Sequence, residues 1–178
     1  MGYAYRLYKM NRKDAQRISR MSYDELLKEY GEDDWFYIGH LPMKELHSNG
    51  ELNADEVIRI HSKGQRFLSD ASFDNSEEAE VTLLEDFAVH EWIRIYRERI
   101  VHFLEELVSE KPDESGQSLS DRQAKYVSSL LTQWQERPPY RIEKDCISAS
   151  RDYEYIIFEL VYQCNALKND EIFVFCSH

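Results

Sequence analysis

Apolar residues recur every three or four positions over much of the chain, which is the spacing of one helix face. The clearest case is the segment after Ser22, where Glu25 completes the sequence of a capping box and Gly31 stands at the position of a C-terminal cap. The apolar residues between the caps are Tyr23, Leu26, Leu27 and Tyr30. We therefore expect a helix over residues 23–30.

The same periodicity predicts five further helices. Their ranges are 11–20, begun by Asn11; 53–68, begun by Asn53 and Glu56; 76–110, the longest; 120–137, begun by the capping box Ser120–Gln123; and 150–169, begun by Ser150. The last has the most regular apolar stripe, formed by Tyr153, Ile156, Ile157, Leu160, Val161, Cys164 and Leu167. The segments 71–76 and 111–119 are polar and are expected to be breaks between helices.

Strand patterns stand at both ends of the chain. Residues 3–9 alternate between two faces, and the dense apolar run at 171–176 favours a strand. Residues 35–41 and 140–142 are weaker strand candidates, and 42–47 is expected to form one helical turn before the turn at Asn49-Gly50. Because chain ends commonly lie close together, we expect the two terminal strands to share a sheet.

These elements predict an α+β fold in a single domain over residues 1–178. The expected architecture is a small, mainly antiparallel sheet that includes both terminal strands and is covered on one face by five to six helices, one of them long. Helix 150–169 should pack its stripe against this sheet and bury Leu160. Hydrophobic residues make up 42% of the chain, which is enough to form a core. The chain has only six Gly and four Pro, so long linkers are not expected.

The sequence also bears on the expected cellular location of the protein. No apolar run approaches the roughly 18 residues of a membrane span, and the N-terminus lacks the apolar core of a secretory signal. The three cysteines, Cys146, Cys164 and Cys176, have no metal-type spacing. We expect a soluble cytoplasmic protein, monomeric or homodimeric, with no cofactor, no metal and no membrane contact.

Charge is distributed unevenly along the chain. The net charge is −12, yet residues 1–20 hold six basic residues and one acidic residue, or +5, which leaves −17 for the rest. Between Phe67 and Ile93 there are eight acids and no Lys or Arg. The acids are Asp70, Asp74, Glu77, Glu78, Glu80, Glu85, Asp86 and Glu91. Such a segment repels phosphate backbones and attracts basic proteins, although acidic surfaces also serve solubility alone.

Two other clusters are candidate binding surfaces. Arg12, Lys13, Arg17 and Arg20 lie on one predicted helix face, but this face is short for nucleic acid and opposes a total charge of −12. We expect it to pair with acidic surface of the same chain, or to meet an acidic partner, and not to bind nucleic acid directly. The aromatic clusters 35–37 and 153–155 are expected to pack in the core, with a protein interface as the alternative.

Candidate chemistry is sparse. His90-Glu91 begins like the zinc motif H-E-x-x-H, but Arg94 occupies the position of the second His and cannot bind a metal. His90, Arg94, Glu98 and His102 form a ladder at i, i+4 spacing on the predicted long helix. The ladder is expected to face solvent without metal; the alternative is an acid/base site of a small hydrolase-like enzyme using His90, Glu98 and His102.

The remaining histidines suggest no site, and phosphate-binding and nucleophile-elbow motifs are absent from the sequence. His40, His47 and His61 lie in separate predicted elements and are expected to be surface or core residues. Cys176 and His178 are a terminal pair without a third partner.

The expected function is therefore binding and not catalysis. By analogy of size and charge, the chain fits an acidic inhibitory protein, of the kind of an immunity or antitoxin protein that neutralises a basic, nuclease-like toxin. The eight acids between Phe67 and Ile93 are the expected partner-binding surface, held on a helix anchored by Phe87 and Trp92. A non-inhibitory accessory protein and the hydrolase-like enzyme are the alternatives.

Overall fold

The computed structural model of the chain describes residues 3–68, 80–109, 121–136, 141–142, 144 and 154–177. The chain forms two compact units, and each is described here by itself. The first comprises Met1–Ala88 together with Leu167–His178, and the second comprises Val89–Ala166. The expectation of a single domain over residues 1–178 stays a prediction.

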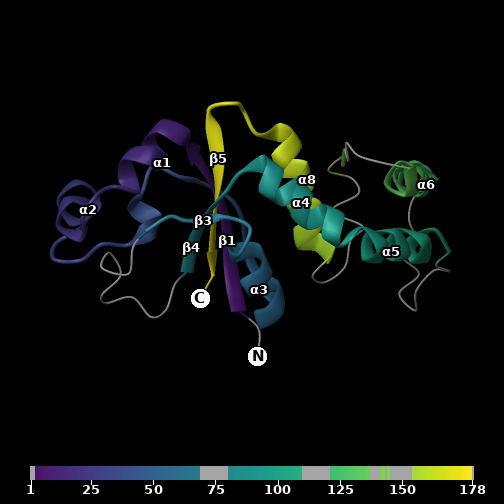
Figure 1. Cartoon of the computed structure of the whole chain (residues 1–178), viewed down its shortest axis with the longest axis horizontal. Helices are drawn as coiled ribbons and strands as arrows, with labels where there is room; N and C mark the ends of the chain where they lie inside the picture. Colours follow the sequence, from purple (N-terminus) through teal and green to yellow (C-terminus); the bar gives the residue numbers. More distant parts are fainter. Residues whose placement is uncertain are drawn as a thin grey trace. The chain divides into compact units, whose positions relative to one another are not determined.

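The first unit is built on an open, five-stranded antiparallel sheet with the strand order β2-β1-β5-β4-β3 (Figure 1). The strands are β1 (Tyr3–Asn11), β2 (Lys44–Leu52), β3 (Gln65–Arg66), β4 (Glu80–Leu84) and β5 (Glu171–Ser177). The two terminal strands lie side by side, with Tyr5 opposite Ser177 and Lys9 opposite Phe173. The predicted α+β class and the pairing of the chain ends are thus confirmed.

The helices after β1 begin where the sequence places their caps. The Asn11 side chain accepts a hydrogen bond from the Lys13 backbone N–H (2.9 Å) at the start of α1 (Arg12–Ile18). Ser22 and Glu25 form the predicted capping box at the start of α2 (Tyr23–Tyr30). Gly31 ends α2 in an extended conformation (φ −78°), and not in the left-handed conformation usual for a glycine cap.

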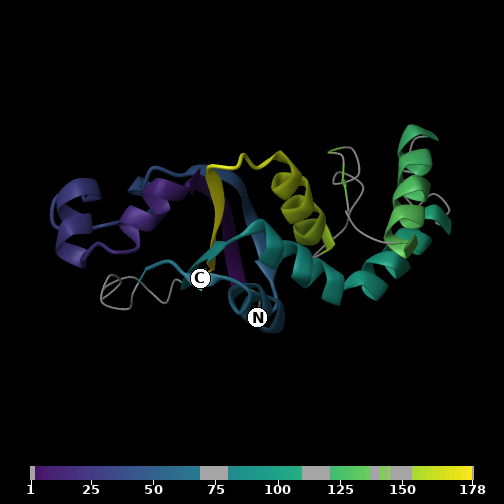
Figure 2. The same cartoon turned by 45° about the horizontal axis from the view of Figure 1, so that its top comes forward.

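Helices of the first unit cover both faces of the sheet, so the expectation of a single covered face is wrong (Figures 1 and 2). Neighbouring residues of a strand point to opposite faces. Tyr8 and Val174 form a cross-strand pair in the cluster with buried residues of α1 and α2, such as Ile18. The adjacent pair contains Phe175, whose ring meets His61 at the end of α3 (Ala54–His61). A strand buried on both faces needs no alternation, which explains the dense apolar run of β5.

The segment between α2 and β2 differs from its prediction. Residues 35–41 form no strand: Trp35 pairs only with Glu32 across a tight turn, and Ile38–His40 forms a 3₁₀ helix, η1. Phe36 and Ile38 pack against the core, whereas Trp35 and Tyr37 are exposed, so core packing holds for only part of this aromatic cluster. The predicted helical turn at 42–47 is wrong, because β2 begins at Lys44. An edge strand such as β2 needs few apolar residues, so its polar sequence shows no strand pattern.

Helix α3 is shorter than predicted. It begins after Asn53, whose side chain accepts from the Glu56 backbone N–H (2.9 Å), but it ends at His61 and does not reach Leu68. Gly64 then lies so close to β4 that a Cβ atom on it would be 2.5 Å from the carbonyl oxygen of Leu83. Residues 65–66 pair with β4, and this tertiary pairing overrides the helical spacing of the sequence.

The predicted long helix over 76–110 is wrong. Residues 69–79 lie outside the described residues, 80–84 are β4, and the remainder is divided into α4 (Asp86–Ile95) and α5 (Arg97–Ser109). The run Val81–Leu84 is buried as a strand beside β5. At the break, the Tyr96 N–H is shared between the carbonyls of Trp92 (3.3 Å) and Ile93 (3.1 Å). Apolar spacing continues across such a break, so periodicity does not reveal it.

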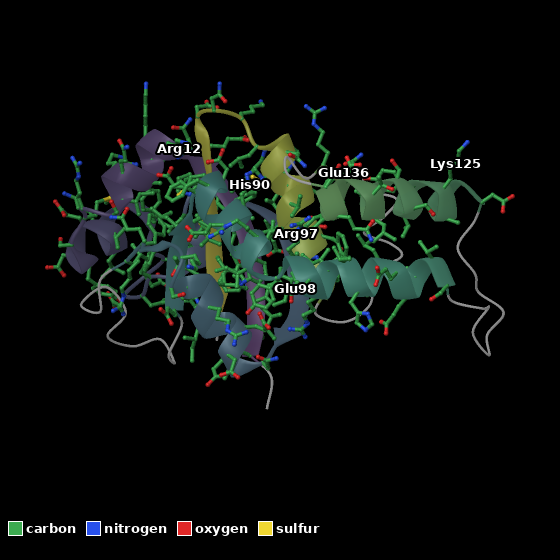
Figure 3. The ribbon with its side chains drawn as sticks, turned by 45° about the vertical axis from the view of Figure 1, so that its right-hand side comes forward. Arg12, His90, Arg97, Glu98, Lys125 and Glu136 are labelled. Carbon is green, nitrogen blue, oxygen red and sulfur yellow. The ribbon has the colours of Figure 1, made fainter. Side chains whose placement is uncertain are left out.

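The second unit is helical in its described part, with α5, most of α4, α6 (Asp121–Glu136) and α8 (Glu154–Ala166). Phe158 of α8 contacts the rings of Phe103 (centroids 5.7 Å apart) and Trp134 (6.5 Å). Leu160 is buried as predicted. Arg97 donates to the carbonyl oxygens of Trp134 (2.6 Å) and Gln135, and so caps the end of α6 (Figure 3).

The part of the chain that the structure describes holds seven α-helices, because the one predicted long helix is two. None of the described helices is long and apolar enough to cross a membrane. The predicted breaks at 71–76 and 111–119 lie outside the described residues, as do Ser120, Ser150, Tyr153 and Tyr140. Arg141 and Ile142 form no strand. The packing of α8 against the sheet stays a prediction.

Candidate functional site

The predicted acidic surface is only partly within the described residues. Asp70, Asp74, Glu77 and Glu78 lie outside them. The other four acids are all exposed: Glu80 on β4, Glu85 between β4 and α4, Asp86 at the first position of α4, and Glu91 further along α4. Asp86 also suits the positive end of the helix dipole, so its presence there has a structural reason of its own.

Phe87 is the unexpected residue of this surface. It was predicted to anchor the helix together with Trp92, and Trp92 is indeed buried, but Phe87 is 65% exposed. The inward stripe of α4 consists of Ala88, Val89, Trp92 and Ile93. Phe87 lies one position outside this stripe, and its ring therefore stands at the surface directly after Glu85 and Asp86.

A hollow of about 240 Å³ lies beside Phe87. Its lining residues come from the turn after α3, from strands β3, β4 and β5, from the link between β4 and α4, and from the start of α4: Lys63, Gly64, Gln65, Leu83, Glu85, Phe87, Ala88 and Ile172. This volume is below the roughly 300–1,000 Å³ of ordinary small-molecule sites. It suits one inserted side chain better than a cofactor.

Two of the four basic residues predicted to share a face, Arg12 and Arg17 of α1, pair with acids of the same chain. Arg12 Nη1 lies 3.4 Å from Glu85 Oε2, and the Arg12 Nε–H donates to the carbonyl oxygen of Asn169 (3.2 Å). Arg17 Nη1 reaches both carboxylate oxygens of Glu29 (2.7 and 2.8 Å). The hydrogen bond from Arg17 holds the pKa of Glu29 below its usual range. Arg12 therefore offsets part of the negative charge beside the hollow.

The histidine ladder does not form one continuous face. His90 and Arg94 lie on α4, whereas Glu98 and His102 lie on α5, beyond the break at Tyr96 (Figure 3). The two histidines have different neighbours: His90 Nε2 is 3.5 Å from the thiol sulfur of Cys164, and His102 Nε2 is 3.3 Å from Glu106 Oε1. Among the described residues, no group of three His, Cys, Asp or Glu side chains could hold a metal ion.

His61 lies in a buried polar cluster that the sequence does not predict. Its Nδ1 atom is 2.5 Å from the Thr82 hydroxyl oxygen, and its Nε2 atom is 2.7 Å from the Ser177 hydroxyl oxygen. Burial lowers the pKa of His61, while the Glu80 carboxylate, 3.9 Å from Nδ1, acts in the opposite direction. The two hydroxyls therefore hydrogen-bond an imidazole that burial keeps neutral.

His61 and Ser177 have the chemical groups of a base and a nucleophile, but both side chains are buried and a substrate could not reach them. His61, Thr82 and Ser177 are all buried, with Ser177 only 3% exposed. A reacting serine must reach its substrate, so this arrangement acts as a structural tie between α3, β4 and β5. No sequence signal could have revealed it, because His61 and Ser177 are 116 residues apart and match no motif.

Comparisons with models of protein families, with curated proteins and with solved structures gave no significant match. The functional argument therefore rests on the surface of the chain itself.

Proposed function

We propose that the chain is an acidic protein-binding protein that docks a basic protein partner at the start of α4. We further propose that binding inhibits the partner, a nuclease-like toxin, as immunity and antitoxin proteins do. The observation that supports docking is the exposed ring of Phe87, which follows Glu85 and Asp86 and borders the 240 Å³ hollow. Inhibition rests on the analogy of size and charge.

This arrangement has the composition of an interface anchor. An exposed phenylalanine gains roughly 1.5–3 kcal/mol when it is fully buried, and aromatic residues are enriched at the centre of interfaces. The carboxylates of Glu85 and Asp86 attract a cationic surface during approach, which raises the association rate. The hollow offers space for one side chain of the partner.

Arg12 makes the proposal more specific. Its guanidinium is 3.4 Å from Glu85, so a cation from the partner competes with it for the same carboxylate. Replacing Arg12 with Gln removes this competitor and should strengthen binding. A partner that instead recognised the basic face of α1 would lose affinity with the same change, so Arg12→Gln separates the two modes.

The test begins with a pull-down from the native host with the full chain, followed by kinetics on the recovered partner at two salt concentrations. The double variant Glu85→Lys/Asp86→Lys should associate more slowly, with weaker salt dependence. Phe87→Ala should mainly speed dissociation, by roughly tenfold if the ring is buried in the complex. Nuclease activity of the partner, with and without the chain, tests inhibition.

A matched control is Glu105→Lys/Glu136→Lys, which changes the net charge by the same amount at exposed positions of α5 and α6. It should leave the association rate close to that of the wild type. Association of Glu85→Lys/Asp86→Lys at the wild-type rate at low salt would reduce this surface to a solvated face.

A further inference from the structure

Three aromatic side chains after α2 form a group that we name the aromatic platform: Trp35 and Tyr37, which are exposed, and His40, which is half-buried. Trp35 is 53% exposed and Tyr37 is 38% exposed. The ring centroids of Trp35 and Tyr37 lie 6.1 Å apart, and each lies 5.7 Å from the ring of His40. The rings thus contact one another at the surface and not in the core.

The platform is held by its own backbone. Phe36 and Ile38, which alternate with the exposed rings, pack against the core of the first unit. A Cβ atom on Gly39 would lie 2.5 Å from Cε1 of Tyr37, so the absence of a side chain at this position lets the Tyr37 ring lie against the backbone.

Two hydrogen bonds fix the polar atoms of the platform. Arg6 donates to the Tyr37 hydroxyl (2.6 Å), and His40 Nδ1 lies 3.1 Å from the carbonyl oxygen of Tyr30. The orientations of the Tyr37 and His40 rings are therefore set before any ligand arrives.

An acidic turn leads directly into the platform. Glu32 and Trp35 exchange two backbone hydrogen bonds (3.1 and 3.2 Å), with Asp33 and Asp34 at the tip between them. Asp33 has φ +53°, a left-handed conformation that Asp tolerates better than most residues. All three carboxylates are exposed. The turn thus places three acidic residues directly before Trp35 in the chain.

We propose that the aromatic platform and its acidic turn bind the guanidinium group of an arginine side chain on a protein partner. Aromatic faces attract cations, and a planar guanidinium can stack on a ring while it donates hydrogen bonds to a carboxylate. Within the described residues, the Arg17 guanidinium already combines an aromatic ring with a carboxylate: it lies 5.8 Å from the centre of the Tyr30 ring, donates to the Tyr30 hydroxyl and donates to Glu29. Arg6 occupies the hydroxyl edge of Tyr37, so the incoming arginine takes a ring face.

This inference does not depend on the surface at the start of α4, because it uses different residues. It also explains two exposed aromatic side chains that contribute little to the core. Solubility accounts for the carboxylates of the turn, but not for a tryptophan and a tyrosine held outward beside them.

Trp35 supplies its own reporter. The other two tryptophans of the chain, Trp92 and Trp134, are buried, so a ligand at the platform changes the fluorescence of Trp35. The probe is a short peptide with two arginines between glycines. The reference peptide replaces each arginine with citrulline, which keeps the shape and removes the charge. The full chain should give a saturable fluorescence change with the arginine peptide and none with the citrulline peptide.

Two variants keep Trp35 as reporter and alter the platform. Tyr37→Leu removes a ring, and Gly39→Ala displaces that ring; each should weaken peptide binding by roughly 5- to 30-fold. Asp33→Asn/Asp34→Asn should weaken binding and reduce its salt dependence. Unfolding in urea confirms that each variant is folded.

Three results would overturn the inference: no fluorescence change at millimolar arginine peptide, an equal response to citrulline, or unchanged affinity in Tyr37→Leu. The variant Glu85→Lys/Asp86→Lys should bind the arginine peptide as the wild type does. A failure of the proposed function at α4 is therefore distinguishable from a failure at the platform.

Discussion

The Nε2 atom of His61 lies 2.7 Å from the hydroxyl oxygen of Ser177, so a single buried imidazole joins the end of α3 to the last strand of the sheet. On its other side, Nδ1 contacts the hydroxyl of Thr82, and the ring packs edge-on against Phe175 (centroids 5.1 Å apart). The contact has consequences for stability that can be measured.

We predict that stability falls in mild acid because of His61. Burial lowers the pKa of His61 in the folded chain below its ordinary value near 6.5, so the unfolded chain binds the proton first as the pH falls. The contribution of His61 to the free energy of unfolding is complete above pH 6.5. It is lost as the pH falls from 6.5 to the lower pKa of the folded chain, and the free energy of unfolding then changes by up to about 1.4 kcal/mol per pH unit. Urea unfolding between pH 5.5 and 7.5 measures this slope.

The matched variants are His61→Gln, which should lose the slope, and His102→Gln, an exposed histidine of α5, which should retain it. The lowered pKa values of Glu25, Glu29 and Glu171 act below their ordinary value of 4.5 and do not enter this range. The same slope in His61→Gln as in the wild type would contradict the assignment.

Removing a hydroxyl from this cluster should destabilise the chain at neutral pH. Ser177→Ala leaves His61 Nε2 buried without the hydroxyl that it contacts, at an expected cost of about 1–3 kcal/mol. The exposed Ser62, whose hydroxyl donates to the carbonyl oxygen of Arg59 (2.8 Å), provides the control Ser62→Ala. The two free energies of unfolding, measured in urea, should differ clearly; equal values would mean that the Ser177 contact contributes nothing.

Truncation of Leu160 in α8 to alanine should strongly reduce the free energy of unfolding. Leu160 is buried, so Leu160→Ala should reduce the free energy of unfolding by about 2–5 kcal/mol. Val108→Ala, at an exposed apolar position of α5, should change it by less than about 0.5 kcal/mol. A Leu160→Ala value as small as that of Val108→Ala would show that the site is not packed.

Cys176 should resist alkylation in the folded chain. Burial raises the pKa of its thiol to about 11, although Arg6 acts in the opposite direction. At pH 8 roughly one thiol in a thousand is then the reactive thiolate. Iodoacetamide treatment followed by mass spectrometry should find Cys176 modified in urea and unmodified without it. Equal modification in both states would contradict the burial of this strand.

Local signals in the sequence predicted much of the fold. Asn11, Ser22 and Asn53 cap helices where expected, because a cap depends on a few neighbouring residues. The two terminal strands were found because each is rich in apolar or aromatic residues. The polar sequence of edge strand β2 lacks that signal and does not predict a strand. The apolar run of β4 continues the spacing of α4 and therefore predicts a helix.

The candidate surfaces were less predictable for a physical reason. Which side of α4 faces inward is decided by tertiary packing, so Phe87 could not be placed at the surface from spacing alone. The outward position of Trp35 and Tyr37 likewise follows from Phe36 and Ile38 reaching the core. The His61 cluster joins three elements that are distant in sequence, and only the folded chain brings them together.

The pairing of β1 with β5 also determines when the sheet can form during synthesis. Asn11 and Asp170, which meet where the two strands join, are separated by 159 residues. At translation rates of roughly 5–20 residues per second, β1 waits about 8–30 s before its central partner emerges from the ribosome. During this interval the edge of β1 that faces β5 is open to wrong pairings, and the sheet can be completed only after β5 has been synthesised.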